Sequence, residues 1–211
     1  MATSKKSLKD AYAVRTPQDS IDLYREWASS YDDNFAKKHD YQSPSAIANY
    51  FQEYGKKEDT PVLDIGAGTG LVGECLKESF RGTIDGIDIS PEMLEFARKK
   101  KCYSKLIQCD LTKNLPLDES SYGAVVSAGT FTHGHVGPDA LDELLRVTKQ
   151  NGLFVFTVHS EVFSQANFSA KLASLKTQIT KPVYHEVRAY GNSIDKNHCD
   201  DTVFITIFRK K

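Results

Sequence analysis

The chain has 211 residues, 40% of them hydrophobic and 26% charged, and its formal net charge is −1. That length and balance predict one well-buried α/β domain and leave too little chain for two. The near-zero charge gives no electrostatic footprint for nucleic acid, and no apolar run approaches the length of a membrane span. We therefore expect a cytoplasmic protein, with a nuclear location also compatible, that meets a small-molecule or protein substrate.

The cysteines carry no metal-binding signature. Cys75, Cys102, Cys109 and Cys199 sit at no spacing typical of a metal site. Three of them fall inside apolar helix or strand patterns, so we expect reduced thiols, as in the cytosol or nucleus, and no bound metal.

The N-terminal region predicts a tail and two helices. Residues 1–18 are mostly polar and show no periodicity, which predicts a flexible tail. Ser20 can cap a first helix with one aromatic stripe, which comprises Tyr24, Trp27 and Tyr31. Ser43, followed by proline, predicts the start of a second helix. The polar residues 32–42 between the helices could fold over a ligand as a lid, and their acidic pair at 32 and 33 would be a solvated turn.

Residues 62–70 read VLDIGAGTG, a short apolar strand that runs into three glycines at every second position. Glycine tolerates positive φ and leaves room for a ligand beside the backbone. The residues that follow have helical spacing, so the loop opens a helix whose N-terminus favours electron-rich ligand groups. This pattern is typical of a loop that binds a nucleotide cofactor.

Strands and helices alternate after this loop. Further strands are expected at 83–90, 105–111, 122–129 and 152–159, with helices between them. Strict alternation predicts right-handed βαβ units and a doubly wound, mostly parallel sheet with helices on both faces and its ligand at the carboxyl ends of the strands. The last part breaks the pattern. It predicts a helix over 162–180 and then two strands, 182–190 and 201–210, that form an antiparallel hairpin.

A dinucleotide-binding loop is the first alternative, because residues 68–73, GTGLVG, match Gly-x-Gly-x-x-Gly. The register argues against it, since the turn from strand to helix is already made at Gly66 and the sixth residue from there is Leu71. Asp88 at the end of the second strand would bind a ribose with either kind of cofactor. The closing hairpin decides between the two.

In these residues the chain resembles the class I S-adenosylmethionine-dependent methyltransferases over residues 44–211. VLDIGAGTG resembles the first motif of that family, Asp88 its ribose-binding acid, CDLT at 109–112 its adenine-side motif, and the hairpin its reversed seventh strand. The segments DGIDISPEML and SAGTFTHGHVGPDALDELLRVTK, with YDDNF and YQSPSAIA, are similar to the Williams-Beuren syndrome chromosomal region methyltransferase-like proteins.

The resemblance implies an α/β fold with a seven-stranded sheet in the order 3-2-1-4-5-7-6, strand 7 being antiparallel. It implies S-adenosyl-L-methionine as the cofactor, S-adenosyl-L-homocysteine as its product, and a single domain over 19–211. The three expected parts of that domain are N-terminal helices forming a lid (19–57), a cofactor-binding core (58–160), and a helix with the hairpin (161–211).

The resemblance also assigns cofactor contacts to the glycine loop and the strand ends. Asp64 would reach the amino group of the cofactor, Asp88 would accept from both ribose hydroxyls, and Asp110 would accept from the exocyclic amine of adenine. The other expected contacts are Gly66, Ala67, Gly68, Gly70, Ile89, Met93, Leu111, Ala128 and Gly129.

Methyl transfer by in-line displacement requires the protein to align the nucleophile, exclude water and, where needed, take a proton. His133 and His135, just past the fourth strand, are candidates for the proton role, with a structural role in their loop as the alternative. Tyr31 is a further catalytic candidate. The expected substrate contacts are Trp27, Tyr41, Phe131 and His159. For Trp27, helical spacing favours core packing over a substrate contact.

We expect an enzyme of class EC 2.1.1.- that methylates a small molecule or a protein side chain. The tetrapeptide typical of amino-methylating nucleic-acid enzymes does not follow the fourth strand. The alternative is a non-catalytic methyltransferase-like module that keeps the cofactor site and binds partners. Burial of the two loop histidines away from the ligand cavity would favour the module, and a cleft beside them would favour catalysis.

Overall fold

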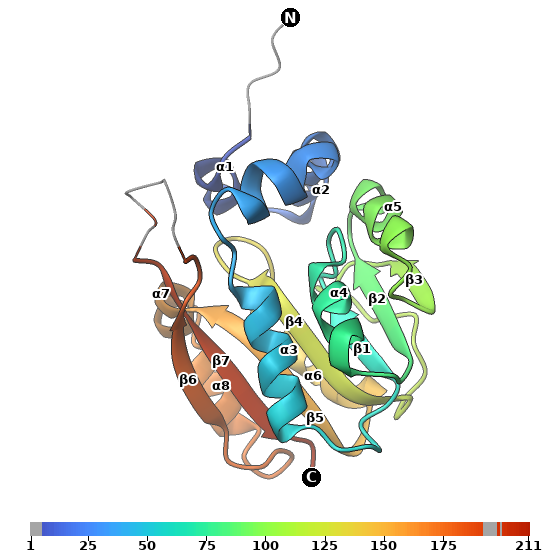
Figure 1. The fold of residues 1–211 in the computed structure, drawn as a ribbon. Helices are drawn as coiled ribbons and strands as arrows, with labels where there is room; N and C mark the ends of the chain where they lie inside the picture. The colour runs from blue at the N-terminus through green and yellow to red at the C-terminus, as the bar shows by residue number, and fades with distance from the viewer. Residues whose placement is uncertain (1–5, 192–197, 199) are drawn as a thin grey trace, which may run out of the picture.

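The computed structural model describes residues 6–191, 198 and 200–211, which contain one seven-stranded sheet (Figure 1). The strand order is β3-β2-β1-β4-β5-β7-β6. The strands are β1 (Val62–Ile65), β2 (Ile84–Asp88), β3 (Lys105–Gln108), β4 (Tyr122–Phe131), β5 (Thr148–His159), β6 (Val183–Arg188) and β7 (Thr202–Arg209). Strands β1 to β5 pair in parallel, and β7 runs antiparallel to both β5 and β6. The predicted order and the reversed seventh strand are confirmed.

Strand β1 lies at the point where the strand order reverses, because it pairs with β2 on one side and β4 on the other. The carboxyl ends of these parallel strands meet at one edge of the sheet, and the loops that leave them diverge to opposite faces. A crevice forms where neighbouring loops part in this way, which is the usual ligand position in doubly wound sheets.

Helices cover both faces of the sheet, and the side-chain alternation of β1 shows why. Val62 packs with α3 (Ser43–Tyr54) and α4 (Leu71–Ser79) on one face, and Leu63 packs with α6 (Ala140–Val147) and α8 (Phe168–Ser174) on the other. Both faces of the strand therefore bury apolar side chains, as expected for a parallel sheet. Helix α5 (Pro91–Lys100) packs on β2 and β3. Within the described residues, no helix combines the length and apolar character needed to cross a membrane.

The prediction of a flexible tail over residues 1–18 is wrong for residues 8 to 14. Helix α1 (Leu8–Tyr12) buries Leu8 and Ala11, and Val14 is buried just after it. These small apolar side chains are too few and too closely spaced to show a period, yet they pack against α2 and the hairpin. Residues 1–5 lie outside the described residues.

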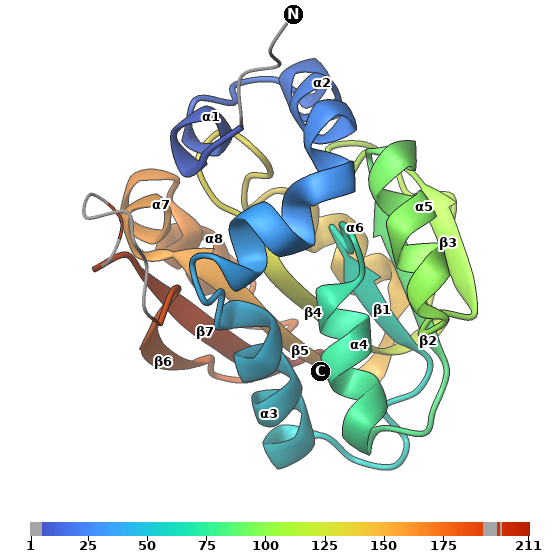
Figure 2. The ribbon, with the colours of Figure 1, turned by 45° about the horizontal axis from the view of Figure 1, so that its top comes forward.

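Helix α2 (Pro17–Trp27) begins earlier than predicted. Thr16, not Ser20, is the N-cap: its hydroxyl accepts from the Asp19 amide, and the Asp19 carboxylate accepts from the Thr16 amide. Proline in the first turn completes the signal. Helices α1 and α2 lie over the carboxyl ends of the central strands (Figures 1 and 2).

The segment expected as a polar lid is partly buried. A 3₁₀ turn over Ala28–Ser30 leads into a π-helical turn over Asp32–Lys37, which buries Phe35 and Ala36. Single π-helical turns are often found at functional sites. The aromatic stripe that begins in α2 therefore continues past its end, and residues 32–42 combine buried side chains with exposed ones.

The last helix also differs from its prediction. Instead of one helix over 162–180, α7 (Ser160–Gln165) and α8 are separated at Asn167, which has a positive φ of 58°. Strand β5 starts at Thr148 rather than 152, because the β4–β5 pairing already begins there, opposite Tyr122. Most of the predicted connection between the last two strands, at 192–197 and 199, lies outside the described residues.

Candidate functional site

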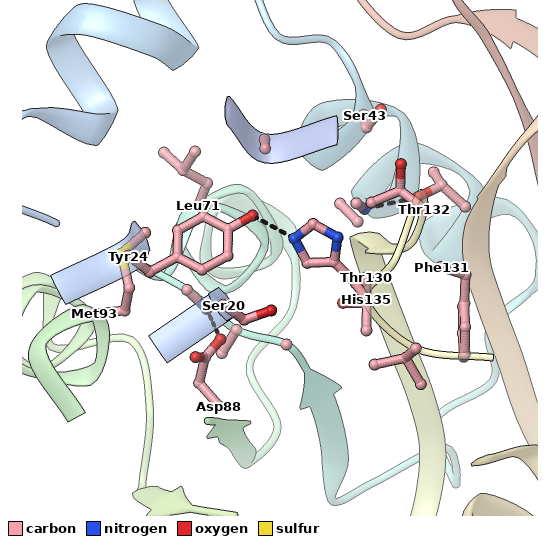
Figure 3. Close-up of a pocket in the computed structure, with 18 of the residues that line it drawn as sticks. Ser20, Tyr24, Ser43, Leu71, Asp88, Met93, Thr130, Phe131, Thr132 and His135 are labelled. Carbon is pink, nitrogen blue, oxygen red and sulfur yellow. Dashed lines mark hydrogen bonds between the residues drawn. The ribbon is translucent and has the colours of Figure 1, made fainter. Parts of the chain in front are cut away.

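A cavity lies at the carboxyl edge of the sheet, between the glycine loop and the N-terminal helices (Figure 3). Most of the predicted site residues line it. They are Trp27, Tyr31, Tyr41, Gly66, Ala67, Gly68, Asp88, Ile89, Met93, Asp110, Leu111, Ala128, Gly129, Phe131, His135 and His159. Three predicted residues, Asp64, Gly70 and His133, are not part of the lining.

The glycine loop needs its glycines for two separate reasons. Gly66 and Gly68 have φ angles of 62° and 54°, which most side chains avoid. A Cβ on Gly66 would also lie 2.1 Å from Oγ1 of Thr130, which donates to the carbonyl of Ile65. The loop is therefore pressed onto the end of β4, and its outer side is left open to the cavity.

Asp88 ends β2 with its carboxylate held by two backbone amides. Its Oδ2 accepts from the Gly68 amide and its Oδ1 from the Ser90 amide, each at 2.8 Å. Burial raises the pKa of this carboxyl above its ordinary value, while these amide bonds oppose the shift. The acid is thus fixed at the cavity floor beside the glycine cradle, where it can accept from paired hydroxyl groups. Those features fit the ribose of an adenosine cofactor.

Asp64 faces away from the cavity. Its Oδ2 accepts from the hydroxyl of Tyr103 at 2.6 Å, and its Oδ1 is buried without a hydrogen-bond partner. Burial raises the pKa of Asp64 to about 7. A Cβ on Gly73 would lie 2.4 Å from the Tyr103 ring. The last glycine of the GTGLVG match therefore makes room for Tyr103 and not for a dinucleotide.

The third strand supplies the far end of the cavity. Leu111 is buried beside it, and Asp110 accepts from both the amide and the hydroxyl of Thr112 through Oδ1. On the other side Met93 is buried at the start of α5. An acid flanked by two apolar side chains suits a flat base with an exocyclic amine.

Aromatic side chains form the opposite wall. Tyr24, Trp27, Tyr31, Phe35, Tyr41 and Tyr190 all line the cavity, and neighbouring ring centroids in this group lie 4.8 to 6.3 Å apart. Trp27 is only 2% exposed, so its packing role holds, but it also faces the cavity. Core packing of Trp27 is therefore seen, and its contact with a substrate stays a prediction. We call these six residues the aromatic wall.

His135 lines the cavity and has a defined hydrogen-bond pattern (Figure 3). Its Nδ1 lies 2.6 Å from the carbonyl oxygen of His133, and its Nε2 lies 2.9 Å from the hydroxyl of Tyr24. A carbonyl can only accept, so Nδ1 carries the proton and Nε2 accepts from Tyr24. Burial lowers the pKa of His135 below its ordinary value. The neutral ring thus presents a basic nitrogen on the cavity side.

His133 occupies a different place, next to the end of β5. Its Nε2 lies 3.1 Å from Glu161, and its ring centroid lies 4.5 Å from that of His159. Nδ1 of His159 accepts from the Glu161 amide and caps α7. One donor atom from each of these three residues lies within 4.8 Å of the other two, so this is the cluster of described residues that could hold a metal ion.

One pair of contacts at the site could not be expected from the sequence pattern. The hydroxyl of Thr69 donates to Oδ1 of Asp32 at 2.5 Å, and Oδ2 of Asp32 lies 2.8 Å from Nζ of Lys100. The predicted solvated turn at 32 and 33 is therefore wrong for Asp32, which ties the N-terminal segment to the glycine loop. Only Asp33 pairs at the surface, with Lys37.

The fold, the glycine cradle and the acid at the end of β2 together define a class I S-adenosylmethionine-dependent methyltransferase domain, with S-adenosyl-L-methionine as its cofactor. A family model described as a methyltransferase domain matches residues 63–156.

Within this class the chain is similar to human Methyltransferase-like protein 27, at 30% identity over 156 residues, which cover 72% of this chain and 63% of that protein. This relative fits the resemblance to the Williams-Beuren region methyltransferase-like proteins. The chain is also 34% identical over 126 residues to a malonyl-[acyl-carrier protein] O-methyltransferase of Halalkalibacterium halodurans, covering 56% of this chain and 46% of that protein. The matched part of the chain thus covers less than two thirds of the length of the first relative and about half of the length of the second.

Among solved structures, the [4+2]-cyclase SpnF superposes with a TM-score of 0.69 and 15% identity, covering 94% of this chain and 97% of that one. Such a likeness shows the fold alone. A fold shared with a protein described as a cyclase also shows that function must be argued from the site and not from the architecture.

Proposed function

We propose that this chain transfers a methyl group from S-adenosylmethionine to a small organic molecule held against the aromatic wall. The observation that carries the proposal is the position of His135, whose basic Nε2 lines the same cavity as Gly68 and Asp88. The bound cofactor would supply an electrophilic methyl group on its sulfonium. The cradle would orient it, and the wall would exclude water from the reacting atoms.

His135 would take the proton of an oxygen or nitrogen nucleophile. For this the hydroxyl of Tyr24 must give up its hydrogen bond to Nε2, so that the acceptor's own hydrogen replaces it. The lowered pKa keeps the imidazole neutral at pH 7 and able to accept. His133, which does not line the cavity, we assign to positioning: its carbonyl oxygen fixes the tautomer of His135.

The non-catalytic module is the weaker alternative. It would be favoured by loop histidines buried away from the cavity, whereas His135 lines the cavity directly. A small acceptor is favoured over a protein side chain because α1 and α2 supply lining residues from above, among them Leu8 and Tyr24. A macromolecular substrate would have to displace these helices.

The compartment remains part of the proposal. The thiols of Cys75, Cys102 and Cys109 are free, which supports a reducing environment such as the cytoplasm or nucleus.

The test is incubation of the protein with methyl-labelled S-adenosylmethionine and a cell extract separated into small-molecule and protein fractions. We expect label in the small-molecule fraction, and we expect His135→Gln to reduce it at least tenfold while binding of S-adenosylhomocysteine is kept. Label confined to the protein fraction would show that the acceptor is a protein side chain and not a small molecule. Label in neither fraction would favour the binding module.

A further inference from the structure

The charges around the cavity are unevenly distributed. The described residues of its lining include two carboxylates, Asp88 and Asp110, and they include no lysine and no arginine. Both carboxylates belong to the strand ends that we assign to the ribose and adenine of the cofactor. The part of the lining that remains for the methyl acceptor contains histidine as its sole ionisable base within the described residues.

Two hydroxyl groups of that remaining part are paired within the protein. The hydroxyl of Tyr24 is bonded to His135, and the hydroxyl of Tyr12 donates to Asp201 at 2.7 Å. Nδ1 of His135 donates to the His133 carbonyl and its Nε2 accepts from Tyr24, which is the hydrogen-bond pattern of an uncharged ring. An anionic acceptor would find no lysine or arginine in the described lining, and a charge without such a partner is costly in a dry, aromatic site.

Two buried polar atoms of the described lining residues, Oγ of Ser43 and Nε2 of His159, have no hydrogen-bond partner. His159 is 5% exposed, its Nε2 makes no hydrogen bond, and the nearest charged group, the Asp201 carboxylate, lies 3.8 Å away. Because Nδ1 of His159 accepts from the Glu161 amide, the neutral ring carries its proton on Nε2. Nε2 of His159 is therefore a possible donor to an oxygen of the acceptor.

We propose that the methyl acceptor is an uncharged, ring-bearing apolar molecule whose ring packs on the aromatic wall, and that carboxylates and phosphates are rejected. The inference rests on the proposed function and names the class of acceptor for that same site. Stacking on the wall supplies affinity, because rings bury a large apolar area and pair favourably with one another. The absence of lysine and arginine from the described part of the lining supplies specificity against anions.

The fluorescence of Trp27 allows binding to be measured without any turnover. Trp27 is the chain's one tryptophan, it is 2% exposed, and it lines the cavity, so its fluorescence reports on occupancy. Quenching of Trp27 by S-adenosylhomocysteine alone tests the cofactor site. If this ligand causes no quenching, the result contradicts the proposed function itself. Phenols are then titrated into the protein saturated with S-adenosylhomocysteine, at pH 7 and with excitation at 295 nm.

Three probes share one ring and differ in charge: 4-ethylphenol is neutral, tyramine is cationic, and 3-(4-hydroxyphenyl)propanoate is anionic. We expect 4-ethylphenol to bind most tightly and the propanoate to bind at least tenfold more weakly. The inference is overturned if the propanoate or tyramine binds as tightly as 4-ethylphenol, or if S-adenosylhomocysteine quenches Trp27 and none of the three probes binds.

A matched pair of variants tests whether charge is the cause. Thr132 lines the cavity from a half-buried loop position, where a long side chain can be accommodated. Thr132→Lys should reduce the tenfold difference between 4-ethylphenol and the propanoate to threefold or less, whereas Thr132→Gln, similar in length and uncharged, should leave it unchanged. Equal effects of both variants would show that space, not charge, sets the preference and would overturn the inference.

Discussion

The hydroxyl of Thr69 donates a hydrogen bond to Oδ1 of Asp32 over 2.5 Å, and so joins the N-terminal segment to the glycine loop. Oδ2 of Asp32 meets Lys100, whose side chain is only 15% exposed. Asp32→Asn removes one of the two carboxylates that pair with Lys100, the other being Glu74, and we expect a loss of about 1 to 2 kcal/mol of local stability. Hydrogen exchange should become faster in residues 28–42.

The matched control is Asp33→Asn. Asp33 pairs with Lys37 at the surface, where both side chains are about three-quarters exposed, at 74% and 76%. Such exposed pairs contribute little to stability, so exchange should hardly change. If both variants exchange alike, Asp32 does not anchor this segment.

Asp88→Asn should weaken cofactor binding. An amide side chain keeps one acceptor oxygen but places an NH₂ group where one of the two backbone amides requires an acceptor, and it leaves a bound ribose one acceptor fewer. Loss of charge-assisted bonds should cost about 1.5 to 3 kcal/mol in the affinity for S-adenosylhomocysteine, measured by calorimetry. Asp85→Asn is the control. Asp85 is equally buried on β2 and bonded to Tyr122, but it does not line the cavity, so its variant should lose stability and keep affinity.

Asp64 should make stability depend on pH. Burial raises its pKa from 3.8 to about 7, against the opposing effect of the Tyr103 hydrogen bond. The native state therefore holds this proton more tightly than the unfolded chain does. Its stabilising effect is complete below about pH 4 and is lost as the pH rises to about 7, by on the order of 4 kcal/mol in total.

Asp64→Asn cannot ionise and still accepts from Tyr103. Urea unfolding at pH 5 and pH 8 should therefore show the variant gaining stability over the wild type more strongly at pH 8. Parallel changes at both pH values would mean that Asp64 titrates as an ordinary carboxyl.

His135 should be found as the Nδ1–H tautomer, because its Nδ1 lies against a carbonyl oxygen. Burial lowers its pKa, so it should protonate only below the ordinary value of about 6.5, and its contribution to stability should fall as the pH drops through the folded pKa. Nitrogen chemical shifts of the imidazole, followed with pH, measure both properties. A proton on Nε2 at pH 7 would remove the basis for its role as a base.

Helix α1 should be held in place by Leu8, which is 2% exposed. Leu8→Ala should cost about 2 to 4 kcal/mol of docking free energy, more than a five-residue helix can absorb, so α1 should detach while the sheet stays folded. Amide exchange over residues 8–14 measures this directly. Lys9→Ala, on the exposed side of the same helix, should leave exchange unchanged. If residues 8–14 are equally protected in both variants, the side chain of Leu8 does not hold α1 in place.

The core of the fold could be predicted because its signals are local. The run VLDI has a length and composition that suit only a buried strand, and the glycines after it permit a turn that other residues resist. Pro91 and Pro44 mark helix starts in the same way. The sheet order and the reversed seventh strand could not be read from periodicity, and came from the likeness of whole motifs to one family.

The N-terminal region shows what local patterns miss. Leu8, Ala11 and Val14 are too sparse to predict a helix, and they are ordered because α2 and the hairpin offer them an apolar surface. Asp32 looks like a solvated acid in sequence, since its partners Thr69 and Lys100 are 37 and 68 positions away and only folding brings them near.

By itself, then, the sequence determined the doubly wound sheet, the class of cofactor and the residues at the ends of β1 to β4, because glycine geometry and apolar spacing act within a few residues. Only the tertiary structure decided which of those residues face the cavity. It turned Asp64 towards Tyr103, separated the side chains of His133 and His135, and brought Tyr190 against the aromatic rings of residues 24–41. These outcomes depend on contacts between elements, and such contacts leave no periodic trace along the chain.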